Sequence, residues 1–193
     1  MKRKIRCLLV LTLAVCLALT GCTPLAMTPP KARITAGFTA MCNVTAEVTP
    51  PDKTEPEKFA FSGRIKRLGS GFWEISITSP DTLAGLKISL SGDTVTSSLG
   101  ELWHEDEVGD IPAASPFMTI FRSLDSAAVA VENGQTLTAA KGVENSWTLA
   151  AGGSNILFDE QGVPTAMTMA GISVEFSEFA LLDTDTTLGK SEA

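Results

Sequence analysis

The sequence predicts a mainly β domain: a strongly curved antiparallel sheet of about ten strands, with one amphipathic helix covering its inner face. Short runs in which apolar and polar residues alternate with a period of two, separated by glycine-containing turns, predict the strands. A single segment with apolar residues at helical spacing predicts the helix. A chain of 193 residues, 44% of them hydrophobic, is long enough for one domain with its own core.

Runs in the first half of the chain carry the alternation most clearly. Around residues 58–66, aromatic and aliphatic side chains alternate with lysine, serine and arginine, which is typical of an antiparallel strand with one wet side. Tight turns such as Gly92-Asp93 separate consecutive runs, so neighbouring strands are expected to form a meander. The strands are expected at residues 36–48, 58–66, 73–78, 86–91, 94–99, 135–141, 146–151, 155–159, 165–169 and 172–181.

The helix is expected to start at Ser115 and Pro116, which are typical of an N-cap and a first helical position. Its apolar residues recur at i, i+3, i+4 and i+7: Phe117, Ile120, Phe121 and Leu124. Such a stripe must pack on the sheet, because burying each Phe or Leu contributes about 1.5–3 kcal/mol. The helix is therefore expected as a plug or lid, with its polar residues on the other side: Thr119, Arg122, Ser123 and Asp125.

The N-terminus has the layout of a bacterial lipoprotein signal. Four basic residues, Lys2, Arg3, Lys4 and Arg6, precede an apolar run at 8–19. The following Leu19-Thr20-Gly21-Cys22 resembles a lipobox. Cys22 would then become the first mature residue and carry a diacylglyceryl group, the alternatives being an ordinary cleaved signal or a short anchor. The expected division is a signal peptide at 1–21, the lipidated cysteine and a proline-rich tether at 22–33, the β domain at 34–182 and a flexible tail at 183–193.

Charge and cysteine content restrict the partners of the mature chain. Residues 1–21 hold four of the 15 basic residues and none of the 22 acidic ones, so the mature formal charge is −11. Such a surface repels nucleic acid and anionic lipid, so we expect no nucleic-acid partner and membrane attachment through the acyl chains of Cys22. The expected location is the extracytoplasmic face of the cell membrane, or an outer membrane where the host has one. Cys42 is expected as a small buried residue.

Residues that could perform catalysis are sparse. His104 is the only histidine, and the G-x-S-x-G motif of serine hydrolases is absent from the sequence. We therefore expect no enzyme, no catalytic residue and no cofactor. His104 and the acidic residues 105–107 could offer metal ligands, but adjacent residues on a strand point to opposite faces. A solvated acidic loop, anchored in the core by Trp103, is the expected structure there, with no metal site.

Three stretches resemble the LolA/LolB-like lipoprotein carrier superfamily. Residues 71–80, with a glycine turn, Trp73 and a closing proline, are similar to one of its strands, and residues 156–162 and 172–177 are similar to its closing hairpins. The resemblance spans about residues 38–182 and implies an incomplete barrel that encloses a cavity for acyl chains. The chain departs from the family in its proline-rich segment, which leaves little room for a long helix before the first strand. The family's functional arginine is matched to no single residue, with Arg64 and Arg122 available.

Apolar side chains on one face of the predicted sheet and helix are the candidate lining of a hydrophobic ligand cavity. With this lining the protein would bind or transfer a lipid or an acylated protein. The alternative is a dry, filled core in a structural or interaction module of the envelope, with an acidic face for an unidentified protein partner. A third possibility, a cation-dependent adhesion or sensor domain, would depend on metal binding near His104. The candidate lining residues are Phe59, Phe61, Trp73, Ile75, Ile77, Leu86, Ile88, Phe117, Ile120, Phe121 and Leu124.

Overall fold

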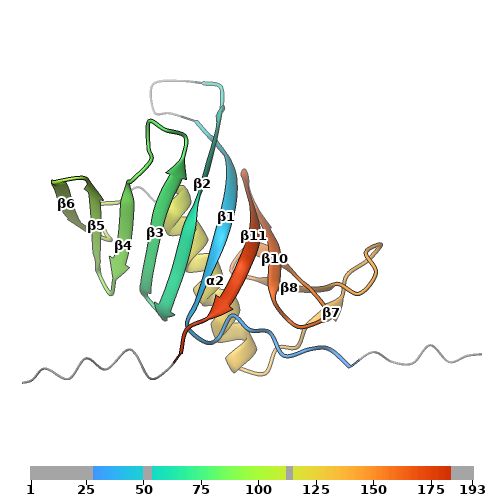
Figure 1. The fold of residues 1–193 in the computed structure, drawn as a ribbon. Helices are drawn as coiled ribbons and strands as arrows, with labels where there is room; N and C mark the ends of the chain where they lie inside the picture. The colour runs from blue at the N-terminus through green and yellow to red at the C-terminus, as the bar shows by residue number, and fades with distance from the viewer. Residues whose placement is uncertain (1–27, 50–53, 112–114, 184–193) are drawn as a thin grey trace, which may run out of the picture.

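The computed structural model describes residues 28–49, 54–111 and 115–183 of the chain (Figure 1). In this part the chain forms one 11-stranded sheet, in which every neighbouring pair is antiparallel. Helix α2 (Pro116–Glu132) lies against one face of the sheet, which curves around it. The predicted fold class, a curved antiparallel sheet with one covering helix, is confirmed, and it is the architecture that the family resemblance implied.

The sheet is built from two meanders that meet at its centre. The strand order is β6-β5-β4-β3-β2-β1-β11-β10-β9-β8-β7. The first meander comprises β1 (Phe38–Val48), β2 (Glu57–Gly69), β3 (Phe72–Ser79), β4 (Lys87–Ser91), β5 (Thr94–Leu99) and β6 (Leu102–Glu107). The second comprises β7 (Thr138–Ala139), β8 (Trp147–Ala151), β9 (Ser154–Phe158), β10 (Pro164–Met169) and β11 (Ile172–Leu181). Helix α2 connects the two, and β11 then pairs with β1, so the two outer strands remain apart and the sheet is open.

Two strand expectations need correction. Residues 104–107, expected as a loop, belong to strand β6, which pairs with β5 from Thr94↔Glu107 to Leu99↔Leu102. The strand expected at residues 135–141 is reduced to Thr138–Ala139. Both segments lie at an edge of the sheet, where a strand has only one neighbour and the alternation that marks a half-buried strand is weakest.

The core lies between the sheet and α2. On β1 the inward positions are buried and mostly small, with Ala40, Cys42 and Ala46 at 2% exposure or less, and this leaves room for the helix. From α2 the expected apolar stripe is buried at Ile120, Phe121 and Leu124, and Ala127 and Ala128 extend it by another turn. The helix therefore packs along its length and reaches well past the expected stripe.

The start of α2 agrees with the sequence except in one detail. Pro116 occupies the first turn and Ser115 the N-cap position, as expected, but the Ser115 side chain makes no capping hydrogen bond. Instead, the Ser115 carbonyl accepts hydrogen bonds from the backbone N–H and the hydroxyl of Thr119, at 3.0 and 2.9 Å.

The end of the predicted tether is part of the packed domain. Ala32 and Ile34 are buried, and the Arg33 N–H donates to the Gly162 carbonyl at 2.8 Å. Gly162 has a φ of +77°, and a Cβ there would lie 2.1 Å from the Lys31 carbonyl oxygen, so only glycine allows this contact. Within residues 28–37 the backbone turns at 33–36 and forms no helix. The expected signal peptide, Cys22 and the tail beyond residue 183 lie outside the described residues.

Candidate functional site

The predicted cavity residues all lie on the inner face, and they fill the space between the sheet and α2. The Trp73 ring stacks on Phe121 with centroids 5.3 Å apart and planes inclined by 11°, and Phe61 meets Phe117 at 5.0 Å. Ile75, Ile77, Ile88, Ile120 and Leu124 are buried, whereas Leu86 and Phe117 are half-buried. In this conformation these residues form a packed core, so their role as a cavity lining stays a prediction.

Phe59 differs from the other residues of this set. It has the parity of Phe61 on β2, but 39% of its surface is exposed. The first four residues of β2 are all exposed, and burial begins at Phe61, which meets Phe117 in the first turn of α2. The alternation therefore places Phe59 on the inner face correctly, but the burial that we expected from it is wrong.

The inner face stays apolar beyond the reach of α2. Leu86, Leu99 and Leu102, which we call the apolar rim, line a pocket of about 160 Å³ together with Ser97, Ser98, Trp103 and His104. In the ladder Leu99 lies opposite Leu102, and both have the parity of the buried Val95. The exposed fractions of Leu99 and Leu102 are 43% and 76%. The rim is thus a small apolar surface on the same face of the sheet as the core, but it is open to solvent.

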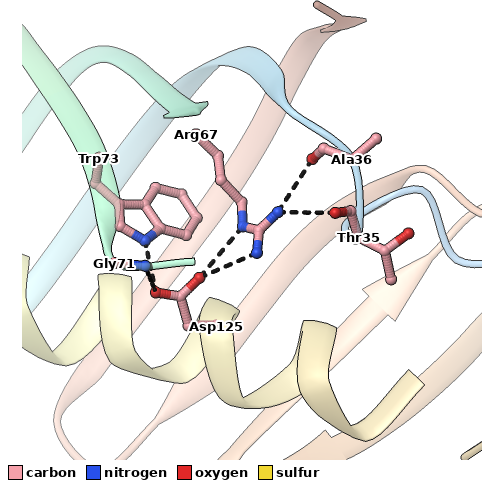
Figure 2. A network of polar contacts seen from close by, with 6 residues as sticks. All are labelled: Thr35, Ala36, Arg67, Gly71, Trp73 and Asp125. Carbon is pink, nitrogen blue, oxygen red and sulfur yellow. Dashed lines mark hydrogen bonds and ion pairs between the residues drawn. The ribbon is translucent and has the colours of Figure 1, made fainter. Parts of the chain in front are cut away.

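A buried polar network ties α2 to the sheet (Figure 2). Arg67 at the end of β2 is 3% exposed, and its guanidinium contacts the Asp125 carboxylate through Nε and Nη2, both at 3.2 Å. The same carboxylate accepts hydrogen bonds at 2.9 Å from the Trp73 indole N–H and the Gly71 backbone N–H. Asp125 on the helix therefore holds the β2–β3 hairpin at three positions: Arg67, Gly71 and Trp73.

Arg67 also holds the segment that precedes β1. Its Nη1 donates to the carbonyls of Thr35 and Ala36 at 2.9 and 3.3 Å, and its guanidinium carbon lies 5.6 Å from the centre of the Trp73 ring. In the described part of the chain, every buried side-chain nitrogen and oxygen has a hydrogen-bond partner. The cluster therefore fixes helix, hairpin and N-terminal segment together, and it contains no nucleophile.

Our sequence reasoning missed both members of this ion pair. Arg64 and Arg122 were the arginines considered, but both are exposed, and Arg64 pairs with Glu178 on the surface at 2.9 Å. Asp125 was expected on the polar side of the helix; it is instead half-buried, and its neighbour Ser123 is buried. The signal for Arg67 was present, because it follows Ile65 by two residues and so occupies an inward position. A charged residue at such a position indicates a buried partner.

The polar segment around His104 is exposed. His104 Nε2 lies 3.1 Å from Asp106 Oδ1, because residues two apart on β6 share a face. In the described ranges, no three His, Cys, Asp or Glu residues gather in an arrangement that could hold a metal ion. The expectation that Trp103 anchors this segment in the core is wrong: Trp103 is 71% exposed, because it lies opposite Ser98 and so points to the outer face of the sheet, away from α2.

Cys42 is buried at 2% exposure, as expected. Desolvation by burial raises the pKa of its thiol from 9.0 to about 11, and a backbone hydrogen bond with Gly63 offsets only part of that shift. The thiol is therefore protonated and unreactive at neutral pH. Within the residues that the structure describes, no helix is both long enough and apolar enough to cross a membrane.

Comparisons with known proteins give distant likenesses in structure only. No model of a protein family matches the sequence, and no curated protein matches it either. A conserved protein from Thermus thermophilus is similar with a TM-score of 0.43 and 11% identity, covering 77% of this chain and 80% of that chain. A LolA superfamily protein from Nitrosomonas europaea is similar with a TM-score of 0.39 and 10% identity, covering 79% and 89%. A domain from Vibrio parahaemolyticus, described as an outer membrane lipoprotein-sorting protein, is similar with a TM-score of 0.38 and 11% identity, covering 83% and 90%.

Proposed function

We propose that this chain is a lipid-anchored extracytoplasmic protein that binds a hydrophobic ligand, a lipid or an acylated protein, on the inner face of its sheet. The observation that carries the proposal is the apolar rim. Leu86, Leu99 and Leu102 continue the inner face beyond α2 and line a pocket there. Contiguous exposed apolar side chains mark binding surfaces in soluble domains, whereas singly exposed ones do not.

The ligand site needs more room than the rim pocket supplies. At about 160 Å³ the pocket is smaller than the roughly 300–1,000 Å³ of most ligand sites. The first turns of α2 offer a way to add room on the inner face beside Phe61. In the described part of the chain, no hydrogen bond or ion pair joins residues 116–122 to the sheet, whereas Asp125 further along is held by Arg67. The start of the helix would move away from Phe61, with Asp125 as the fixed point.

Binding of this kind requires no chemical step. Each CH₂ group removed from water contributes about 0.8 kcal/mol, so an acyl chain supplies its own driving force. We therefore propose a binding or transfer role without enzymatic activity and without a cofactor.

Anchoring through a lipidated Cys22 would hold the domain at the membrane surface. The described N-terminal segment and the β5–β6 turn lie at opposite ends of the strands (Figure 1). Leu99 and Leu102 of the apolar rim flank that turn, so they lie at the end of the sheet that is remote from the N-terminal segment.

The test compares charged substitutions on the rim and on the outer face of the sheet. The variant with Leu99→Glu and Leu102→Glu is expected to bind a fluorescent fatty acid at least about tenfold more weakly, because charge disfavours an apolar chain nearby. Both side chains are exposed, so the melting temperature should stay that of the parent. Leu68→Glu, at a 48% exposed position of the opposite parity on β2, is the matched control and should bind normally. Equal binding by all three proteins, or none by the parent, would refute the proposal.

A second candidate function is favoured by the packing at the centre of the molecule. Trp73 stacks on Phe121 and Phe61 meets Phe117, as in a filled core. An envelope interaction module would need no ligand and would recognise a protein partner through its acidic surface. A parent protein that takes up no fatty acid would favour this role.

A further inference from the structure

Strand β6 presents a free edge of backbone hydrogen-bonding groups. It is the last strand on its side of the sheet, and within the described residues it pairs only with β5 (Figure 1). The Val108 N–H donates to the Asp93 carbonyl at 2.8 Å, which sets the alternation along the ladder. His104 and Asp106 therefore turn their backbone groups toward β5, and Trp103, Glu105 and Glu107 turn theirs outward.

The side chains of these three outward residues share the outer face of the sheet. Trp103 stands out among them because 71% of its surface is exposed, whereas Trp73 and Trp147 are buried at 1% and 6%. Tryptophan is enriched in protein interfaces and among the residues that contribute most to binding. The three leucines of the apolar rim lie on the other face of the sheet, and Trp103 also borders the rim pocket at the edge between the two faces.

The charge of the edge selects the partner. Glu105 and Glu107 carry two negative charges along it, and in the described structure neither carboxylate has an ion-pair partner. A second copy would fit poorly. Antiparallel pairing of two β6 strands about Glu105 places that carboxylate opposite its own copy, and like charges directly opposite destabilise a strand pair. An extended segment with lysine or arginine at the facing positions has the complementary charge.

We propose that the outer edge of β6 binds an extended, basic segment of a partner protein and adds it to the sheet as a further strand. The backbone groups of Trp103, Glu105 and Glu107 supply the ladder, their carboxylates select cationic side chains, and Trp103 covers the aliphatic part of the added strand. This interaction requires no hydrophobic ligand, so it does not rest on the proposed ligand binding, and it names a site for the acidic-surface interaction of the second candidate function.

The test uses the full chain in detergent and two synthetic peptides of about nine residues, the length of a long strand. One alternates lysine with valine and threonine, and its twin has glutamate in place of lysine. The lysine peptide is expected to bind at least about tenfold more tightly, and less tightly as salt rises. Bound peptide should slow amide hydrogen exchange at the outward residues of β6 and shift the emission of Trp103, the exposed one of the three tryptophans.

Two variants separate charge from backbone pairing. The double variant with Glu105→Lys and Glu107→Lys should prefer the glutamate peptide, whereas Glu160→Lys, at an exposed turn elsewhere, should keep the parent's preference. Glu105→Pro removes an outward N–H that the β5 ladder does not use, so it should fold and lose the peptide. Three results would each overturn the proposal: equal binding of both peptides by the parent, protection on another strand, or self-association through β6.

Discussion

Arg67 shows how burial, more than distance, decides the importance of an ion pair. Its contact with Asp125 at 3.2 Å is longer than the 2.9 Å contact of Arg64 with Glu178. Removing a guanidinium from water costs several kcal/mol, so Arg67 depends on every partner it has in the folded state. Arg64 and Glu178 are 47% and 65% exposed and keep most of their hydration.

We therefore predict losses of stability that differ in size for the same substitution at these two arginines. Arg67→Met should lower the free energy of unfolding by about 3–5 kcal/mol, because it leaves the Asp125 carboxylate without its cation. Arg64→Met should lower it by less than about 1 kcal/mol. Urea unfolding of both variants checks this. Similar losses at the two positions would mean that the buried network does not hold the helix.

Cys42 makes the free energy of unfolding depend on pH in the alkaline range. The pKa of its thiol is raised by burial to about 11, so the folded protein holds this proton more tightly than the unfolded chain. Its contribution to stability is complete below about pH 9 and is lost as the pH rises through the folded value, by about 2–3 kcal/mol in all. Urea unfolding from about pH 8 to about pH 11 should show this loss in the parent. A Cys42→Ala variant with the same slope would contradict it.

At the scale of the element, Gly63 controls how closely β2 and β3 approach. A Cβ at this position would lie 2.5 Å from the Ser76 carbonyl oxygen, a backbone atom that cannot rotate away. The register of the two strands also shifts between Ser62 and Gly63. The position therefore excludes any side chain, although the alternation of β2 suggests only an ordinary inward residue.

We predict that Gly63→Ala destabilises the fold by roughly 1–3 kcal/mol, the usual cost of overpacking. Gly69→Ala, at the end of the same strand, is the control. Nothing lies within 4 Å of a Cβ there, and the reduced freedom of the unfolded chain should leave stability unchanged or raise it by up to about 1 kcal/mol. Thermal unfolding compares the two variants. A neutral Gly63→Ala would show that β2 and β3 separate easily.

The elements that the sequence predicted well are those buried on one side. Around Phe61 and Ile65 the alternation is regular, because one face packs on the helix and the other is wet. Strand β6 lacks that contrast: both of its faces are largely exposed, so its residues need not alternate. For the same reason Trp103 was expected in the core, although its position opposite Ser98 places it on the outer face of the sheet, away from α2.

At the scale of the whole molecule, the pairing of β1 with β11 joins the two meanders into one sheet and could not be predicted from local patterns. Met41 and Ser177 lie opposite each other across the central pair, although most of the chain separates them. The same holds for Arg67 and Asp125, which meet only after the chain has crossed from the first meander into α2. The amphipathic stripe of the helix predicted that it covers the sheet. It did not predict which charged side chains the covered space would contain.

The central claim is that the inner face of the sheet binds a hydrophobic ligand. Native mass spectrometry of the chain without residues 1–21, purified from cells and compared before and after extraction with organic solvent, tests it most directly. We predict that the protein carries a bound molecule with the mass of a lipid and that extraction removes it. The extracted protein should then take up a fluorescent fatty acid. A protein that carries no such mass and takes up no fatty acid after extraction would contradict the claim, and would favour the interaction module with a filled core.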